Sequence, residues 1–370
     1  MDERLNFLFL TEAEAVQAGA GNMPRCIEVM EEVFSLLGQG DYLMGSPNRN
    51  SHGIKLYFPK ESPFPNMPKK GPDRRFMALI AYLGGRFNVC GEKWYGSNLA
   101  NRDRGLPRSI LTTVLNDADT GAPIAFMGAN TLSATRTGAI PAVGARYFAR
   151  TDASVLSVIG IGVIGRSCLE ALMAVLKNIQ EIRVYDLNQP AAQAYCQELE
   201  RTYKGVQAVT ADSVEQAVRG SHVVNVATSG AASPRIEDEW LEEGVLLTLP
   251  ASADVSEQLM CQATVVVDNW RMYEAYAQEL RDEPGGFAAN LSGICGYLMD
   301  LEQAGKIQRE SIVNLGDVVA RKIPGRRDEK EKVVFIMDGM PVEDVAWGCE
   351  IYQNAQRMGL GTKLNLWGER

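Results

Sequence analysis

From about residue 153 to residue 270, short β-branched runs alternate with longer stretches of helical spacing. The runs expected to be strands are 154–160, 181–186, 206–210, 221–228, 244–249 and 263–268. Between them, apolar residues recur at intervals of three and four, as they do in amphipathic helices. This alternation is typical of a parallel sheet with helical crossovers. The pattern therefore predicts an α/β fold, a Rossmann-type doubly wound parallel sheet.

The first 130 residues have a different pattern. A helix is expected near residues 23–37, followed by meandering strands at 76–87, 89–96 and 108–128, with "NDADTG" as a hairpin turn. After residue 268 the pattern predicts a helix at 271–280, a late strand at 332–338 and a final helix at 342–358. We therefore expect two domains. Residues 1–130 and 345–370 form an α+β domain, and residues 131–344 form the Rossmann domain.

Charge and composition exclude several classes of protein. The formal net charge is −9, and the basic doublets Lys69-Lys70 and Arg326-Arg327 form no larger block, so we expect no nucleic-acid partner. No apolar run approaches the ~18 residues of a membrane helix, and the charged first four residues predict no secretory signal. Seven scattered cysteines without a C-x-x-C pair and only two histidines indicate a cytoplasmic protein with no metal site.

The first expected Rossmann strand runs into the glycine loop Gly160-x-Gly162-x-x-Gly165, with Val163 and Ile164 between the last two glycines. A strand before the loop, a helix after it and an acidic residue at the end of the next strand favour dinucleotide binding over a purely structural turn. That acidic residue is Asp186, which could accept hydrogen bonds from both ribose hydroxyls. The following Leu187-Asn188 offers no cation for a 2′-phosphate, which favours NAD and leaves NADP possible.

The fourth Rossmann strand ends in "VATSG". Thr228 and Ser229 could hydrogen-bond to the cofactor there, and a plain turn at the end of the strand explains them equally well.

Three separated motifs resemble the ornithine cyclodeaminase/mu-crystallin family. They are "EKWYGSNLANRDRGLPRSILTTVLNDADTGAP" at 92–123, "LSATRTGAIPAVGARYFA" at 132–149 and "IMDGMPVEDVA" at 336–346. The resemblance covers most of residues 75–350 and is nearer to the family's amino-acid and imino-acid dehydrogenases. It implies that the α+β domain binds substrate and forms a homodimer, and that the last helix returns to that domain.

The resemblance also implies roles for individual residues. Arg136 and Lys93 would bind the substrate carboxylate, with Lys93 also acting in catalysis. Thr137 would lie beside the cofactor and Arg108 near its pyrophosphate. A guanidinium and an ammonium that are desolvated together do suit a small anionic substrate. Without the resemblance, a surface arginine and a lysine on a strand face would be the default interpretation.

Three positions depart from the family pattern. Ala78 stands where ornithine cyclodeaminases have a glutamate, which questions recognition of a distal amine. Asp254 is the nearest candidate for the catalytic aspartate, although it would serve equally as the N-cap of a helix starting at Val255. Lys55 stands loosely where the family has another carboxylate-binding arginine.

Asp344 is expected in the first turn of the last helix, where negative charge is favourable, and a Glu343–Asp344 acid/base pair is disfavoured.

The sequence thus predicts an NAD(P)-dependent oxidoreductase acting on the C–N bond of a small amino or imino acid. Two alternatives remain at this point. One is a cyclodeaminase-type lyase that uses NAD catalytically, and the other is a crystallin-like protein that binds NAD(P)H or another ligand without turnover.

Overall fold

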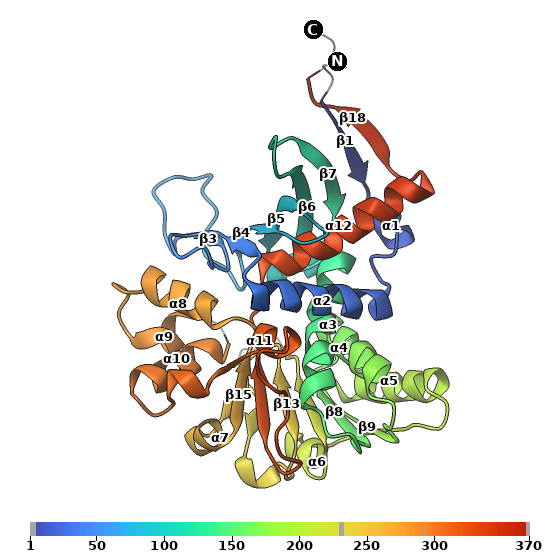
Figure 1. Cartoon of the computed structure of the whole chain (residues 1–370), viewed down its shortest axis with the longest axis vertical. Helices are drawn as coiled ribbons and strands as arrows, with labels where there is room; N and C mark the ends of the chain where they lie inside the picture. The colour runs from blue at the N-terminus through green and yellow to red at the C-terminus, as the bar shows by residue number, and fades with distance from the viewer. Residues whose placement is uncertain (1–4, 229–232, 292, 368–370) are drawn as a thin grey trace. The chain divides into compact units, whose positions relative to one another are not determined.

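The structure is a computed structural model that describes residues 5–228, 233–291 and 293–367. The chain forms two compact units, each built from separate segments (Figure 1). Unit 1 is Met1–Asn22, Gly40–Arg136 and Met340–Arg370, and unit 2 is Met23–Gln39 and Thr137–Gly339. The domain boundaries expected after residues 130 and 344 stay a prediction. The compact units divide after Arg136 and Gly339, and residues 23–39 join unit 2.

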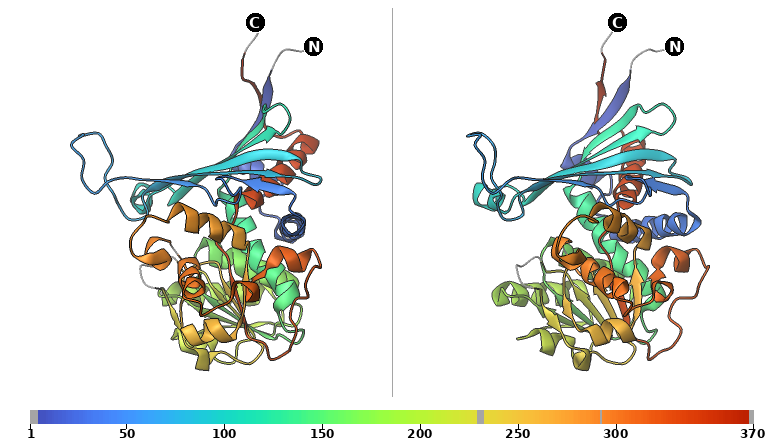
Figure 2. Two further views of the ribbon diagram at one scale, coloured as in Figure 1. Left: turned by 60° about the vertical axis from the view of Figure 1, so that its left-hand side comes forward. Right: turned by 90° about the vertical axis from the view of Figure 1, so that its left-hand side faces the viewer.

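Unit 1 is built on one sheet with the strand order β18-β1-β7-β6-β5-β4-β2, and β3 also pairs with β4. Neighbouring strands are antiparallel except β1 and β7. In both views of Figure 2 the first and last strands lie side by side. The strand bounds are β1 Asn6–Leu10, β2 Tyr42–Met44, β3 Ile54–Tyr57, β4 Arg75–Leu83, β5 Val89–Ser97, β6 Ser109–Asp117, β7 Pro123–Gly128 and β18 Thr362–Asn365.

The β6–β7 hairpin forms because its turn has the required residues. Asp117 Oδ1 accepts a hydrogen bond from the backbone N–H of Thr120 at 2.8 Å, and Gly121 has a φ of +73°, a conformation that glycine adopts without strain. The hairpin expected from "NDADTG" is therefore confirmed.

The long helix α12 (Pro341–Met358) packs against one face of the unit 1 sheet. Glycines permit the close approach, because a Cβ on Gly91 would lie 3.1 Å from Val345 Cγ2 and one on Gly348 would lie 3.3 Å from Thr113 Cγ2. The fully buried Trp347 donates its indole N–H to the carbonyl of Ala20 at 3.1 Å. Unit 1 also contains α1 (Glu12–Gln17) and the 3-10 helix η1 (Leu99–Arg104).

Unit 2 contains a parallel sheet with the strand order β10-β9-β8-β11-β13-β17-β15-β16, and a small pair β12–β14. Its inner strands β11, β13 and β17 are buried at every residue, which explains their mostly apolar sequence. The two polar residues among them pair with each other, since Thr248 Oγ1 donates to Asn225 Oδ1 at 2.9 Å. The strand bounds are β8 Val155–Ile159, β9 Glu181–Tyr185, β10 Gln207–Thr210, β11 Val223–Val226, β12 Arg235–Ile236, β13 Leu246–Leu249, β14 Asp254–Val255, β15 Thr264–Val267, β16 Val313–Asn314 and β17 Val333–Ile336.

The helices of unit 2 connect these strands. Their bounds are α2 Met23–Gln39, α4 Val163–Val175, α5 Gln189–Thr202, α6 Val214–Val218, η2 Asp238–Trp240, α7 Glu257–Gln262, α8 Trp270–Glu279, α9 Gly286–Asn290, α10 Cys295–Gln303, η3 Arg309–Ser311 and α11 Leu315–Val319. Helix α3 (Asn130–Phe148) begins in unit 1 and continues in unit 2.

The doubly wound sheet expected from the sequence is confirmed, and all six expected strands belong to it. The late strand β17 inserts between β13 and β15, so the chain does return to an earlier sheet. Across the described parts of the chain, no helix is both long and apolar enough to cross a membrane.

Candidate functional site

Four charged side chains meet in the interior of unit 1. Lys93 comes from β5, Arg136 from α3, and Glu343 and Asp344 from the first turn of α12. Asp344 Oδ2 accepts from Lys93 Nζ at 2.7 Å and from Arg136 Nη2 at 2.9 Å, and its Oδ1 accepts from Arg136 Nε at 3.0 Å. Glu343 Oε2 accepts from Arg136 Nη1 at 2.8 Å. The predicted substrate-binding pair Arg136 and Lys93 therefore lies in one cluster.

This cluster is deeply buried. The side chains of Lys93 and Arg136 are 4% and 7% exposed, and those of Glu343 and Asp344 are not exposed at all. Buried charges are costly unless they are paired, so the two carboxylates on α12 compensate the two cations. The interpretation of Arg136 as a surface arginine is thus wrong.

Local structure brings these groups together. Lys93 lies directly opposite Leu79 on β4 and Thr113 on β6, so it points to the face of the sheet that α12 covers. Pro341 begins α12, where a missing N–H has no cost, and this first turn carries both carboxylates. Asp344 is in this first turn, as expected, but its contacts with Lys93 and Arg136 were not anticipated.

Burial sets the protonation of Lys93. Desolvation and the neighbouring positive charge of Arg136 lower the pKa of Lys93 to about 8, although Asp344 and Glu343 oppose the decrease. Burial alone would raise the pKa of Asp344, but Arg136 and Lys93 together hold it below its usual value. Lys93 can therefore exchange a proton near neutral pH, whereas Asp344 remains ionised.

The arrangement leaves donors for a ligand. A guanidinium has five N–H groups, and the carboxylates of Asp344 and Glu343 account for three of its contacts. Two N–H groups of Arg136 remain for a carboxylate, beside an ammonium that also contacts Ser133 Oγ at 3.4 Å. A guanidinium fork of this kind suits a planar anion.

In unit 2, the glycine loop connects β8 to α4. Gly160 has a φ of +91°, and a Cβ there would lie 2.9 Å from the carbonyl of Ala227. A Cβ on Gly165 would lie 1.9 Å from the carbonyl of Gly160, so only glycine lets the helix approach the strand this closely. A Cβ on Gly162, which is the N-cap of α4, would meet nothing within 4 Å. The loop is therefore shaped to present backbone N–H groups to a phosphate.

Asp186 follows β9 and braces the loop. Its Oδ2 accepts from the backbone N–H of Ile161 at 2.9 Å, and its Oδ1 accepts from that of Asn188 at 2.9 Å. Val163 is 72% exposed and Leu187 is 88% exposed, so apolar side chains flank the carboxylate. This geometry fits the ribose-binding role predicted for Asp186, and the residues present therefore suit a dinucleotide.

The four other residues predicted to contact the cofactor lie in different parts of the chain. Half-buried Thr228 follows β11, and its Cγ2 would lie 3.0 Å from a Cβ on Gly160. Ser229 lies outside the described residues. Thr137 precedes Gly138 on α3, where α3 meets Ser167 of α4 closely. Arg108 Nε donates to Asp73 in unit 1. The cofactor contacts of all four stay predictions.

Asp254 is exposed and lies in the short strand β14. The N-cap of α7 is Ser256, whose Oγ accepts from the backbone N–H of Leu259 at 3.0 Å. The alternative that Asp254 caps a helix beginning at Val255 is therefore wrong, and its catalytic role stays a prediction.

Lys55 and Ala78 lie on opposite faces of the unit 1 sheet. Lys55 lies opposite Met77, which lies opposite Tyr95, so Lys55 is on the same face as Lys93. Ala78 lies opposite Trp94 and therefore on the other face. Its side chain points away from Lys93 and Arg136, so the alanine there does not indicate whether the substrate has a distal amine.

A second buried carboxyl was not anticipated. Asp268 follows β15, and its Oδ2 accepts from the backbone N–H groups of Asp338 and Gly339 at 2.8 and 3.0 Å. Burial, reinforced by the negative charge of Asp338, raises the pKa of Asp268 to about 7 against the effect of these hydrogen bonds. Asp338 in turn accepts from the hydroxyl of Tyr276. The network ties the segment after β17 to the end of β15.

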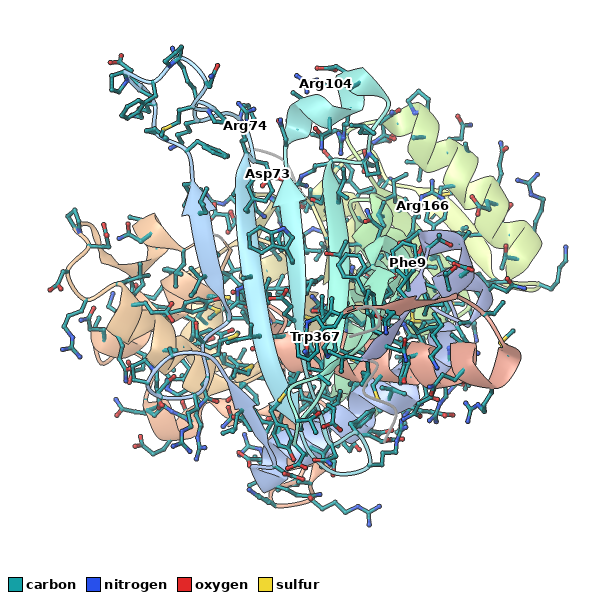
Figure 3. The ribbon with its side chains drawn as sticks, turned by 90° about the horizontal axis from the view of Figure 1, so that it is seen from above. Phe9, Asp73, Arg74, Arg104, Arg166 and Trp367 are labelled. Carbon is teal, nitrogen blue, oxygen red and sulfur yellow. The ribbon has the colours of Figure 1, made fainter. Side chains whose placement is uncertain are left out.

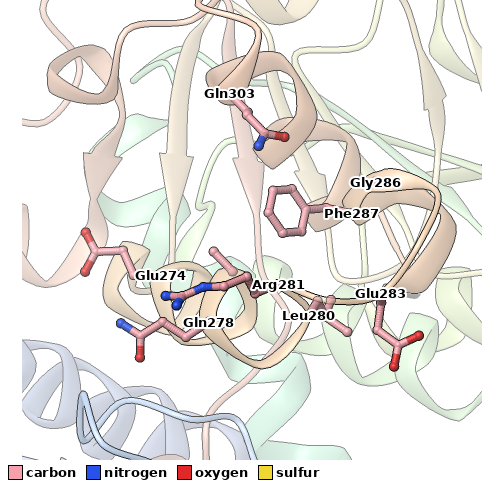
Figure 4. A pocket seen from close by; sticks show the side chains of 9 residues that line it. Glu274, Gln278, Leu280, Arg281, Glu283, Gly286, Phe287 and Gln303 are labelled. Carbon is pink, nitrogen blue, oxygen red and sulfur yellow. The ribbon is translucent and has the colours of Figure 1, made fainter.

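A pocket of about 640 Å³ lies among α8, α9 and α10 of unit 2 (Figure 4). Arg281, Glu274 and Phe287 are among its lining residues, which include none of the predicted site residues. Within residues 5–228, 233–291 and 293–367, no group of three histidine, cysteine or acidic side chains could hold a metal ion.

Sequence comparison gives relatives along nearly the whole chain. One is N-((2S)-2-amino-2-carboxyethyl)-L-glutamate dehydrogenase of Staphylococcus aureus (strain NCTC 8325 / PS 47), 26% identical over 97% of this chain and 98% of that protein. Another is alanine dehydrogenase of Archaeoglobus fulgidus, 29% identical over 92% of this chain and 98% of that protein.

The fold is also similar to solved structures. An archaeal alanine dehydrogenase dimer with bound NAD has a TM-score of 0.77 and 27% identity, covering 98% of this chain and all of that one. The model of the ornithine cyclodeaminase/mu-crystallin family matches residues 20–359. The chain belongs to the ornithine cyclodeaminase/mu-crystallin family.

Proposed function

We propose that this chain is an NAD-dependent oxidoreductase that acts on the C–N bond of a small amino or imino acid. The observation that carries the proposal is the buried cluster in which Arg136 and Lys93 retain donors for a carboxylate. The glycine loop and Asp186 support a dinucleotide as the second reactant. The two relatives named as dehydrogenases of amino acids, and the NAD in the archaeal alanine dehydrogenase, support the same function.

The mechanism assigns separate tasks to the residues of the cluster. Arg136 binds the substrate carboxylate end-on, because Asp344 occupies its Nε and Nη2 side. Lys93 contacts the same carboxylate when protonated, and its pKa of about 8 lets it move a proton to or from the substrate nitrogen. A dinucleotide held by the glycine loop and Asp186 would supply the hydride chemistry needed at the α-carbon. Asp254 is the alternative proton carrier, and Lys55 is a further candidate for substrate binding.

A direct assay tests this function. The full chain is incubated with NADH and either Δ1-pyrroline-2-carboxylate or pyruvate plus ammonia, and with NAD and either L-proline or L-alanine. We expect a stoichiometric change in NADH absorbance with at least one pair. Conversion of L-ornithine to proline without net NADH would instead identify a cyclodeaminase. Tight NADH binding with no turnover of any of these compounds, or of 2-oxoglutarate or oxaloacetate plus ammonia, would favour a ligand-binding protein.

Paired measurements locate the substrate site. Arg136→Lys replaces a planar fork with a single ammonium, and losing one charge-assisted contact of about 1.5–3 kcal/mol lowers kcat/KM roughly 10- to 100-fold. Lys93→Met should be at least as damaging. NADH affinity, measured by fluorescence, should change far less. If turnover fell only as far as NADH binding, neither residue would belong to the substrate site.

The exposed face of the unit 1 sheet supports assembly as a homodimer. Phe76, Ile80, Trp94 and Ile110 are 37%, 51%, 44% and 48% exposed. All four lie on the face opposite to Lys93, and the rings of Phe76 and Trp94 stack with centroids 5.8 Å apart. Figure 3 looks down on this sheet, with Phe9 labelled.

Large exposed apolar patches on soluble proteins commonly mark interfaces. A second copy of this chain is the occupant we assign to this face, because the similar archaeal alanine dehydrogenase is a dimer. Sedimentation of the full chain tests the assignment, and a stable monomer at micromolar concentration would refute it.

A further inference from the structure

A second group of cations extends from the Lys93 cluster along the same face of the sheet. Arg75 lies opposite Ser97, and Ser97 lies opposite Ser109, so all three point to the face that carries Lys93. Arg108 precedes β6, and Asp73 precedes β4 at the strand end labelled in Figure 3. Here the distal cluster means Arg75, Arg108 and Asp73.

The distal cluster carries an excess of positive charge. Asp73 forms ion pairs with Arg75 and with Arg108 Nε, and it accepts from the hydroxyl of Ser97. One carboxylate has two oxygens, whereas two guanidiniums have ten N–H donors, so Asp73 cannot satisfy both. The side chains of Arg75 and Arg108 are 25% and 34% exposed. The cluster is therefore partly desolvated and has a formal charge of +1.

Tyr95 connects the distal cluster to Lys93. Lys93 Nζ and Arg75 Cζ each lie 5.8 Å from the centroid of the Tyr95 ring, so they are separated by no more than about twice that distance. Arg75 Nη2 also contacts the Tyr95 hydroxyl at 3.4 Å. Both cations therefore lie against a single side chain, that of Tyr95.

This separation fits a specific kind of substrate. The carboxyl carbons of an extended five-carbon diacid are about 5 Å apart from standard bond lengths, and a charge-assisted contact adds about 3.5 Å at each end. Such a molecule therefore needs about 12 Å between cations when extended and less when bent, so the upper limit set by Tyr95 favours diacids of no more than five carbons. A monocarboxylate would leave Arg75 and Arg108 without an anionic partner from the substrate.

Given the proposed function, we propose that the substrate is a dicarboxylic amino or imino acid of four or five carbons, with its second carboxylate bound by Arg75 and Arg108. Arg136 and Lys93 bind the carboxylate next to the reacting carbon, and the distal cluster selects for the second one. In this proposal Arg108 binds the substrate, in place of the contact with the cofactor pyrophosphate expected from the sequence. Tyr95 separates the two sites and sets the length of the substrate.

Binding of two isosteric amino acids tests the proposal on the full chain with NAD present. L-Glutamate and L-glutamine have the same length and shape but differ in the charge of the distal group. By titration calorimetry we expect the wild-type protein to bind L-glutamate at least tenfold more tightly than L-glutamine. Arg75→Met should remove most of this preference for L-glutamate while changing the affinity for L-glutamine less than threefold. Arg108→Met should also reduce the preference for L-glutamate.

Arg74→Met is the matched control. Arg74 is the neighbouring cation, but it lies over the ring of Phe58 and donates to the carbonyl of Lys69 at 3.2 Å. The same charge is removed without touching the distal cluster, so the preference for L-glutamate should remain. Equal affinity of wild type for the two amino acids would overturn the proposal, as would failure to bind either or equal losses in the Arg74 and Arg75 variants.

Turnover separates this proposal from the proposed function. We expect NADH oxidation with 2-oxoglutarate or oxaloacetate plus ammonia to exceed that with pyruvate plus ammonia, and Arg75→Met to reverse this order. Efficient turnover of monocarboxylates alone would overturn the dicarboxylate assignment and leave the oxidoreductase function standing. Selective binding of L-glutamate without any NADH change would overturn the oxidoreductase function and leave the distal site standing.

Discussion

Replacing Asp344 with asparagine tests whether α12 organises the substrate site. Asp344 is fully buried and contacts three nitrogen atoms of Lys93 and Arg136 at 2.7–3.0 Å. Asp344→Asn removes the charge but preserves the shape, which leaves two buried cations with Glu343 alone. Removing one partner of a buried ion pair typically costs about 3–5 kcal/mol. We expect a decrease of that order in the free energy of unfolding, measured with urea at pH 7.

The same variant should also alter the pH dependence of catalysis. Asp344 raises the pKa of Lys93 by its charge and its hydrogen bond, and burial and Arg136 lower it to about 8. Without Asp344 this pKa falls further. The protonated lysine binds the carboxylate, so kcat/KM should decline with rising pH at a lower pH than in wild type. The assay is a kcat/KM profile from pH 6 to pH 9.5.

Glu343→Gln provides the graded comparison. Glu343 contacts Arg136 Nη1 at 2.8 Å and the backbone N–H of Met340 at 3.0 Å, and it acts on Lys93 only by its charge. Glu343→Gln should therefore shift the decline of kcat/KM at high pH by less than Asp344→Asn does. Asp344→Asn could lower the free energy of unfolding while kcat/KM still declined at the same pH as in wild type. In that case Asp344 would have only a structural role, and its proposed effect on the pKa of Lys93 would be refuted.

Three further variants test other parts of the structure. Asp186→Ala should weaken NADH binding roughly 10- to 100-fold, because a charged acceptor contributes about 1.5–3 kcal/mol; an unchanged dissociation constant by fluorescence would exclude the ribose contact. Trp94→Lys should give monomers in sedimentation with an unchanged circular dichroism spectrum, and a persistent dimer would place the interface elsewhere. Asp268 keeps its proton up to about pH 7 in the folded state, whereas an unfolded aspartate loses it near 3.8. The folded state therefore binds more protons in this range, and the stability contributed by Asp268 falls as pH rises from about 4 to 7. Asp268→Asn should remove that slope from urea unfolding, and an identical slope would contradict the pKa.

The sequence by itself determined the parallel sheet of unit 2 except for its two-residue edge strand β16. Its central strands are buried runs rich in valine, leucine and isoleucine and bounded by glycine and polar residues, and such local patterns depend little on distant contacts. The glycine loop was equally readable, because Gly160 and Gly165 are required by local backbone geometry. Asp186 could be placed from its position at the end of the next strand.

The short strands were not readable from the pattern. β1 and β18 pair across almost the full length of the chain, with Asn6 opposite Asn365. β16 has only two residues. Short segments carry too few alternating positions to be distinguished from loops, and long-range pairing gives them their identity.

Only the tertiary structure decided the chemistry of unit 1. In the sequence, Asp344 is a favourable acid at a helix start, and more than two hundred residues separate it from Lys93 and Arg136. Folding buries all three together, and burial lowers the pKa of Lys93 while keeping Asp344 charged. The face on which Arg75 and Ala78 lie was likewise set by strand register. Charge, protonation and orientation depend on which groups share a low-dielectric space, and that is a property of the folded chain rather than of any local segment.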